Sequence, residues 1–302
     1  NLFFINPNGI VFGKGSRLDL KGSFIGSTAE SINFSDGNIF STVEPNNPAL
    51  LKINIPLGLQ YGNNSAAIQL KQANLKVKPC KTLGLIGGNV SLDNTIIKAP
   101  GGTIKLGGLL SSGVVNFQNL ESNLKYFSFP ENIKLGDVSL TNKSNIEVIA
   151  GGGGDIFVDA NNFNLSNSNL RAGIKDSLGT EDIVSGDIYI HARENINIDR
   201  ESNIMNILEL NSLGNGGKID IKTKNFFLKD SNILTNTGSI GKAGDITIQA
   251  TNKLEVISSP RNIALGTRGR KGIFSRVEEN GTGYGGNINI ESPEIILSGI
   301  GG

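Results

Sequence analysis

Few side chains in this sequence could carry out acid–base, nucleophilic or metal chemistry. His191 is the only histidine and Cys80 the only cysteine among 302 residues. One histidine excludes metal sites built on a histidine pair, and one cysteine excludes an internal disulfide framework and a cysteine-based zinc site. His191 alternates with the isoleucines of Ile188-Tyr189-Ile190, so it should face solvent from the outer side of a strand. We predict that neither residue is catalytic, that no cofactor or metal is bound, and that the protein is not an enzyme.

Single aspartates that directly follow glycines are the remaining candidates for chemistry. They stand at Asp137, Asp155, Asp187 and Asp245. If the segments that carry them stack, these carboxylates could form a ladder along one edge. Hydrolysis of glycosidic bonds needs two carboxylates at a fixed separation and in different environments, and nothing in the sequence marks such a pair. We keep a carbohydrate-active enzyme, either a polysaccharide lyase or a hydrolase, as the alternative interpretation because of the possible ladder of carboxylates.

Composition narrows the class of protein further. The formal net charge is +1, with 28 Lys and Arg against 27 Asp and Glu. Binding of nucleic acid needs a surplus of cations on one face, so we expect no nucleic-acid partner. No window approaches the 18 apolar residues of a membrane-spanning helix, so we do not expect the chain to span a membrane. The 37% of hydrophobic residues and the 40 glycines together make up about half of the chain, which argues against disorder.

A short phrase recurs along the chain and consists of glycine, a polar residue and an alternating apolar pair. An example is Gly154-Asp155-Ile156-Phe157-Val158. The clear copies begin at Gly154, Gly186, Gly217, Gly244 and Gly286, at intervals of 32, 31, 27 and 42 residues, and weaker copies begin at Gly102 and Gly136. Alternation with a period of two between turn residues predicts short strands, and the abundance of β-branched isoleucine argues against helices.

Each repeat unit holds about three very short strands. A second alternating pair follows the phrase, and a Ser-Asn-apolar step comes next, as in Ser168-Asn169-Leu170, Ser202-Asn203-Ile204 and Ser231-Asn232-Ile233. Such strands become stable when each pairs in parallel with the equivalent strand of the next unit and the isoleucines align in a dry column. The sequence therefore predicts an all-β, parallel β-helix with almost no helix. We expect around a dozen coils, on the order of 50–60 Å in length, with asparagine side chains stacked on one another.

The first hundred residues carry a more specific signal. The opening residues 1–13 read NLFFINPNGIVFG, and PLGLQYG at 56–62 and LGLIGGNVSL at 83–92 follow. These segments resemble the second motif and the continuation of the two-partner secretion domain. That domain is the N-terminal region of filamentous haemagglutinin-type exoproteins of Gram-negative bacteria and cyanobacteria. The resemblance extends over about residues 1–110.

The resemblance implies a right-handed, single-stranded β-helix that is secreted through the periplasm. Export would use the Sec route and an outer-membrane transporter of the Omp85 type. Residues 1–110 would then be the C-terminal part of the secretion domain that the transporter recognises, and residues 111–302 a continuous repeat shaft. A signal peptide and the first motif of the family are expected upstream of Asn1. The implied function is that of a secreted or cell-surface adhesin whose glycan or protein receptor is unknown.

Five residues within the resemblance are the candidate site: Asn6, Pro7, Asn8, Gly9 and Ile10. Proline fixes φ near −65°, and an Asn-Gly pair tolerates positive φ, so this segment predicts a tight corner between two strands. The corner is either purely structural or also docks the transporter, and the sequence leaves both interpretations open.

Segments that loop out from the corners are the expected places for receptor contacts. They are residues 116–130, 171–185 and 260–283. The densest cationic run, residues 268–271, is expected to be a solvated loop, with a glycan- or surface-binding patch as the alternative. Open strand edges at the two ends of the chain also predict end-to-end association.

Overall fold

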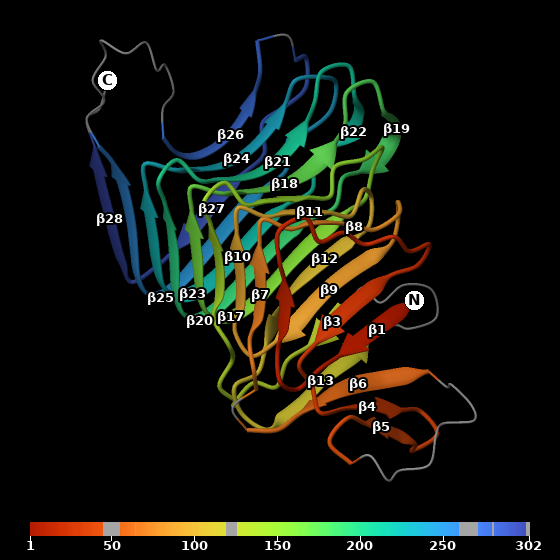
Figure 1. The fold of residues 1–302 in the computed structure, drawn as a ribbon. Coiled ribbons are helices and arrows are strands. Elements are labelled where there is room, and N and C mark those ends of the chain that lie inside the picture. The colour runs from red at the N-terminus through yellow and green to blue at the C-terminus, as the bar shows by residue number, and fades with distance from the viewer. Residues whose placement is uncertain (45–54, 64, 119–125, 260–270, 280, 300–302) are drawn as a thin grey trace.

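The computed structural model describes residues 1–44, 55–63, 65–118, 126–259, 271–279 and 281–299. All regular elements in these residues are β-strands. The described part of the chain contains no helix that could cross a membrane. In Figure 1 the strands of successive coils lie side by side, from the red N-terminal coils to the blue C-terminal coils. The predicted parallel β-helix is confirmed.

Each coil runs through three faces, which we call face 1, face 2 and face 3. Face 1 contains β1 (Leu2–Ile5), β3 (Phe24–Ser27), β9 (Thr82–Gly87), β12 (Thr103–Gly108), β17 (Asp155–Ser166), β20 (Ile188–Asp199), β23 (Ile219–Lys229), β25 (Ile246–Ser258) and β27 (Ile288–Glu291). Face 2 contains β2 (Ile10–Phe12), β7 (Ile68–Lys71), β10 (Val90–Asp93), β15 (Val138–Thr141), the later parts of β17, β20, β23 and β25, and β28 (Glu294–Gly299). Face 3 contains β8 (Asn74–Lys76), β11 (Ile96–Lys98), β16 (Asn145–Glu147), β18 (Asn169–Ile174), β21 (Asn203–Leu208), β24 (Asn232–Thr237) and β26 (Gly272–Val277).

The isoleucines of the repeated phrase lie over one another on face 1. Ile156 pairs with Ile188, Ile188 with Ile219, Ile219 with Ile246, and Ile246 with Ile288, all in parallel strands. The first four have no exposed surface. This column confirms that the five clear phrases occupy equivalent places in successive coils.

The glycine of the phrase is required by the close approach of neighbouring coils. A Cβ atom added at Gly217 would overlap the carbonyl oxygen of Gly186, and one added at Gly244 would overlap that of Gly217. The prediction that the weaker copy at Gly136 occupies an equivalent place is wrong. Its Val138 pairs with Phe163 on face 2, because any strand that follows a corner can show the same short pattern.

Polar ladders run along the coils beside the apolar column. Asn203 Nδ2 donates to Asn169 Oδ1 at 2.8 Å, and Asn232 Nδ2 donates to Asn203 Oδ1 at 2.8 Å. The N–H of Ser168 donates to the Oγ of Ser202, one coil further on, at 3.2 Å. Because both serines are buried, these bonds satisfy polar groups that water cannot reach. The predicted stacking of asparagine side chains is confirmed.

The structure stacks nine strands on face 1 in the described residues, fewer than the dozen coils predicted. Two insertions between face 1 and face 2 take residues out of the spiral. They form an antiparallel sheet of β4 (Ser31–Phe34), β5 (Ile39–Ser41), β6 (Pro56–Tyr61), β13 (Gly113–Gln118) and β14 (Tyr126–Ser128). The sequence did not indicate this sheet, because its strands have the same period-two alternation as those of the coils.

The antiparallel sheet packs on the outer surface of the N-terminal coils and builds a second core there. Ile25 and Ile86 of the coils lie in this core with Leu59 and Tyr61 of the sheet. The Tyr61 hydroxyl donates to the carbonyl oxygen of Ile86 at 2.5 Å and lies 2.8 Å from Ser27 Oγ. Burial raises the pKa of the Tyr61 phenol, so the group stays neutral.

The three segments predicted to loop out are largely strands where the structure describes them. Residues 116–118 and 126–128 belong to β13 and β14, whereas residues 119–125 lie outside the described part of the chain. Residues 171–174 belong to β18, and β19 (Gly179–Val184) pairs in parallel with β22 (Leu213–Asn215). Within 260–283, residues 272–277 form β26, and residues 260–270 and 280 lie outside the described part. β18, β19 and β26 form because each pairs in parallel with a strand of a neighbouring coil, whereas β13 and β14 pair with each other in the antiparallel sheet.

Candidate functional site

The Asn6-Pro7-Asn8-Gly9 segment forms a tight turn between β1 on face 1 and β2 on face 2. The N–H of Gly9 donates to the carbonyl oxygen of Asn6 at 3.1 Å, and the N–H of Asn8 donates to Asn6 Oδ1 at 3.1 Å. The left-handed backbone position falls on Gly9, whose φ is +109°, and a side chain there would be strained. The predicted corner is confirmed.

The next coil holds this turn in place. The N–H of Asn6 donates to the carbonyl oxygen of Ser27 at 2.9 Å, and the N–H of Ile10 donates to that of Ala67 at 3.1 Å. The Asn6 side chain is used inside the turn, and Ile10 is buried in the core. Asn8 is exposed, so it is the candidate residue that offers its side chain to solvent.

The strands on either side of the turn lie at an open edge. β1 pairs with β3, and β2 pairs with β7, but no second strand pairs with either of them among the described residues. Leu2, Phe4 and Val11 on these strands are 45%, 46% and 68% exposed.

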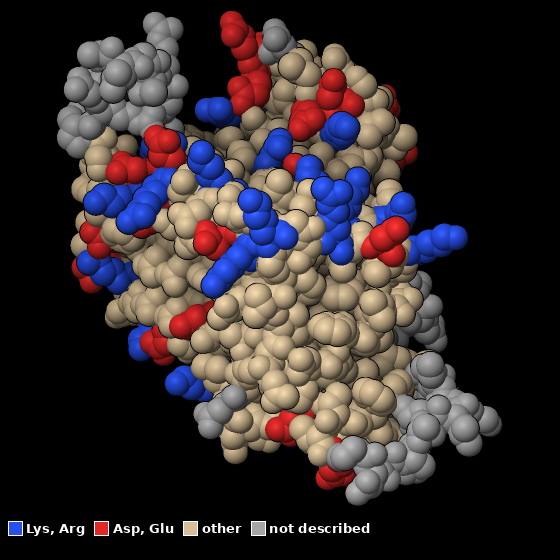
Figure 2. Space-filling view, in the orientation of Figure 1, with Lys and Arg blue, Asp and Glu red and all other residues tan. Residues whose placement is uncertain are grey.

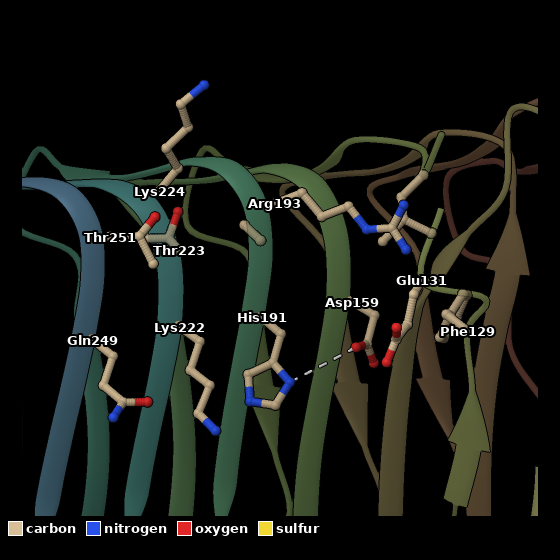
Figure 3. A pocket seen from close by; sticks show the side chains of 12 residues that line it. Phe129, Glu131, Asp159, His191, Arg193, Lys222, Thr223, Lys224, Gln249 and Thr251 are labelled. Atoms are coloured by element: carbon tan, nitrogen blue, oxygen red, sulfur yellow. Dashed lines mark ion pairs between the residues drawn. The ribbon is translucent and has the colours of Figure 1, made fainter. Parts of the chain in front are cut away.

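A separate hollow of about 460 Å³ lies on the outer surface of face 1, where the antiparallel sheet ends (Figure 3). We call it the face 1 groove. One wall comes from the segment that follows β14. The floor comes from outward side chains of β17, β20, β23 and β25. Its lining residues are Phe129, Glu131, Leu135, Asp159, His191, Ala192, Arg193, Lys222, Thr223, Lys224, Gln249 and Thr251.

Arg193 fixes the wall of the groove to the coils. Its guanidinium group donates to the carbonyl oxygens of Pro130 and Ile133. Removal from water lowers the pKa of Arg193, and the nearby carboxylates of Asp159 and Glu131 oppose that shift. The two hydrogen bonds of the guanidinium fasten residues 130–133 to β20.

His191 lies on the groove floor between two carboxylates. Its Nδ1 atom is 4.0 Å from Asp159 Oδ1, and its Nε2 atom is 3.5 Å from Asp220 Oδ1. The contact with His191, foremost, holds the pKa of Asp220 below its ordinary value, and the charges of Lys222 and Lys218 add to this effect. The His191 side chain is 42% exposed, so the predicted position on the outer side of the strand is confirmed.

The corner aspartates that the sequence singled out hold the backbone of the next coil. Asp155 Oδ1 accepts from the N–H of Asp187 at 2.9 Å, and Asp187 Oδ1 accepts from the N–H of Lys218 at 2.8 Å. Asp245 Oδ1 accepts from the N–H of Asn287 at 2.7 Å. The predicted ladder along one edge is confirmed for these three residues.

Asp137 stands apart from that ladder. Its Oδ1 atom accepts from the N–H of Asn162 at 3.0 Å, at the corner before face 2. Cys80 is exposed at another corner, with a φ of +59°. No three His, Cys, Asp or Glu side chains in the described ranges are grouped so that they could hold a metal ion.

Cationic side chains gather on part of the surface. Figure 2 shows Lys and Arg over the upper middle of the viewed face, whereas the lower part carries few charges. On face 3, Lys76, Lys98, Glu147 and Arg171 occupy one column of successive coils. Glu147 pairs with Lys98 at 2.9 Å and with Arg171 at 3.4 Å, so this column is partly neutralised. Of the cationic run 268–271, only Lys271 belongs to the described residues.

Sequence reasoning found the corner but missed the groove. The groove combines residues 129–135 with residues 159–251, and no local pattern predicts that these segments meet. The alternation around His191 was the one available signal. It predicted that this side chain lies on the outer side of its strand, but not which residues lie next to it in the groove.

Comparison with known proteins adds the family. A family model described as the TPS secretion domain matches residues 1–158, which is just over half of the 302 residues. No curated protein matches the chain. The matched range includes the Asn6–Ile10 corner, the first four coils and the antiparallel sheet. The chain therefore belongs to the TPS secretion domain family, as a two-partner secretion exoprotein of the haemagglutinin type that is exported across the outer membrane.

Proposed function

We propose that this protein is a non-enzymatic adhesin, exported through the periplasm by a partner transporter of the Omp85 type and displayed at the cell surface or released. In this proposal residues 1–110 serve recognition by the transporter, and residues 111–302 form a shaft that presents binding surfaces. The observation that carries the proposal is the match of the TPS secretion domain over a rigid parallel β-helix.

The proposed contact with the transporter is the Asn6–Ile10 corner. Its backbone is fixed by hydrogen bonds to the next coil, while Asn8 projects into solvent beside the open edges of β1 and β2. A rigid, exposed turn loses little conformational freedom on binding, which favours recognition. We therefore propose that Asn6 has a structural role in the turn and that Asn8 contacts the transporter.

Substitution of Asn6 and Asn8 separates these roles. The binding partner in the assay is the purified periplasmic region of the cognate transporter. We expect Asn8→Ala to weaken binding at least fivefold with unchanged melting temperature, and Asn6→Ala to lower the melting temperature because the turn loses its side-chain acceptor. Asn74→Ala, at another exposed asparagine on face 3, is the matched control. Unchanged binding of Asn8→Ala would assign the corner a structural role only.

The shape of the shaft supports an adhesive role. Parallel coils repeat the same outward positions at intervals of about 4.8 Å, which gives long polar faces for many weak contacts. The corner acids give the alternative carbohydrate-active enzyme no support, because Asp155, Asp187 and Asp245 each hold a backbone N–H of the next coil.

Retention of protein-coated beads on a host-cell surface tests the adhesive role. We expect beads coated with the folded protein to be retained under flow, and beads coated with heat-unfolded protein to be released. Periodate treatment of the surface reduces retention if the receptor is a glycan, and protease treatment reduces it if the receptor is a protein. Equal retention of folded and unfolded protein would contradict an adhesin.

A further inference from the structure

The face 1 groove has the shape and charge of a ligand site that neither the corner nor the family match explains. It exists because the antiparallel sheet covers only the N-terminal coils, so that residues 129–135, which follow its last strand, form a step beside β17. Arg193 holds the wall of that step to the coils. The hollow is therefore a preformed feature of the fold, as ligand sites usually are.

Two carboxylates in or beside the groove, those of Asp159 and Glu194, are paired with lysines of the protein. Lys105 Nζ donates to Asp159 Oδ2 from behind the wall. Lys224 Nζ lies 2.9 Å from Glu194 Oε2. Lys222 lies on the groove floor in the same register position as His191 of the preceding coil. Among the described residues, no carboxylate oxygen lies within 4.0 Å of the Lys222 ammonium group, although Asp220 is close enough for its pKa to respond.

The side chains that line the groove carry one more positive than negative charge. Arg193, Lys222 and Lys224 line it, with Glu131 and Asp159 as the lining acids. A free ammonium group that projects into a hollow attracts an anionic group from solution. Because the surplus rests on one ammonium group and not on a broad basic surface, it suits a ligand with isolated charges better than a nucleic acid.

The rest of the lining suits a hydroxylated ligand. Thr251 and Gln249 stand on β25 beyond Lys222, and Figure 3 shows their side chains on that side of the groove. The Gln249 amide donates to Glu291 at 2.9 Å, which leaves the Gln249 carbonyl oxygen to accept from a ligand hydroxyl. At the opposite end, the Phe129 ring supplies an apolar wall on which the face of a sugar ring can pack.

The length of the groove sets the size of the ligand. Asp159, His191, Lys222 and Gln249 occupy one column across four successive coils. Neighbouring coils are about 4.8 Å apart, so the wall beside Asp159 and the ammonium of Lys222 are separated by roughly two such spacings. A single small anion cannot contact both, whereas an oligosaccharide can.

We infer that the face 1 groove binds an oligosaccharide that carries carboxylate groups. One carboxylate contacts Lys222, the hydroxyls contact Gln249 and Thr251, and a sugar ring packs against Phe129. This inference rests on the proposed adhesive function and specifies the chemistry of one of its contacts.

The test uses the purified 302-residue protein and two soluble probes. One probe is an oligogalacturonate, and the other is the same oligomer with its carboxylates reduced to hydroxymethyl groups. Binding is measured by titration of backbone amide NMR signals. We expect millimolar or tighter binding of the carboxylated probe, with shifts confined to the region of Phe129 and to β17, β20, β23 and β25, and at least tenfold weaker binding of the reduced probe.

Variants assign the contacts. We expect Lys222→Gln to weaken binding of the carboxylated probe at least tenfold and Thr251→Val to weaken both probes, each with an unchanged melting temperature. Lys143→Gln, at an exposed lysine on the corner between face 2 and face 3, is the control and should bind as the unmodified protein does. Equal binding of the two probes, or unchanged binding by Lys222→Gln, would overturn the inference.

Comparison with the bead assay distinguishes failure of this inference from failure of the adhesive function. Beads coated with Lys222→Gln that are retained as strongly as unmodified beads, together with absent probe binding, would leave an adhesin whose contact lies elsewhere. Probe binding without bead retention would leave a saccharide site on a protein that is not an adhesin.

Discussion

The carboxylate of Asp155 accepts a hydrogen bond from the backbone N–H of Asp187, the equivalent residue of the next coil, at 2.9 Å. One aspartate thus caps a backbone donor that the parallel ladder leaves at the corner, and the relation repeats from Asp187 to Lys218. Where the polar residue of the repeated phrase is an aspartate, its side chain therefore links one coil to the next by a hydrogen bond.

Removal of this cap should cost stability. Asp155 is 7% exposed, and Asp155→Ala leaves the Asp187 N–H without its acceptor. We expect the free energy of unfolding to fall by about 1–2 kcal/mol in urea denaturation. Asp155→Asn should lose less, because an amide oxygen can still accept the bond. Equal losses for the two variants would show that charge, and not the hydrogen bond, is the important property.

In the isoleucine column, the loss of folding stability on substitution by alanine should increase with the burial of the side chain. Ile219→Ala removes a fully buried side chain that packs between two coils, and we expect a loss of about 2–5 kcal/mol. Ile288→Ala is the matched change in the same column, at a side chain that is 43% exposed. We expect it to cost less than half as much. Similar losses at the two positions would contradict the burial described for this column.

Acid should weaken the contacts around His191. The pKa of Asp220 is lowered in the folded protein, mainly by His191, so this carboxylate contributes stability above its ordinary pKa of about 4. That contribution is lost as the pH falls through the lowered value in the folded state. We expect His191→Gln to raise the pKa of Asp220, measured by carboxyl carbon NMR. A pKa that does not change in this variant would remove His191 as the cause.

We predict that the purified 302-residue chain associates through β27 and β28, whose apolar side chains are exposed. Ile288, Ile295 and Leu297 are 43%, 47% and 71% exposed on β27 and β28, and the outer edges of these strands can pair with another chain. We expect the mass from light scattering to rise with concentration, and Ile295→Lys with Leu297→Lys to suppress the rise. A monodisperse monomer at high concentration would contradict end-to-end association.

The sequence predicted the features that depend on local repetition. The register of Ile156 with Ile188 and the ladder of Asn169 with Asn203 follow from a phrase that recurs at similar spacing. It could not predict the direction in which Ser31–Phe34 pairs, because period-two alternation is the same in parallel and antiparallel strands. The groove depends on contacts between distant segments, such as Arg193 with residue 133, and no single segment encodes them.

Cross-linking between coils tests the central claim, that equivalent residues of successive repeats lie side by side in parallel. Asn164 pairs with Asn197, with their side-chain amides 2.9 Å apart on face 2. In a Cys80→Ser background, we expect Asn164→Cys with Asn197→Cys to form a disulfide on mild oxidation, detected by mass spectrometry. The control, Asn164→Cys with Asp199→Cys, is two residues out of register at roughly 8 Å, beyond the reach of a disulfide, and should stay reduced. Efficient cross-linking of the control, or none in the paired variant while it remains folded, would contradict the stacked coils.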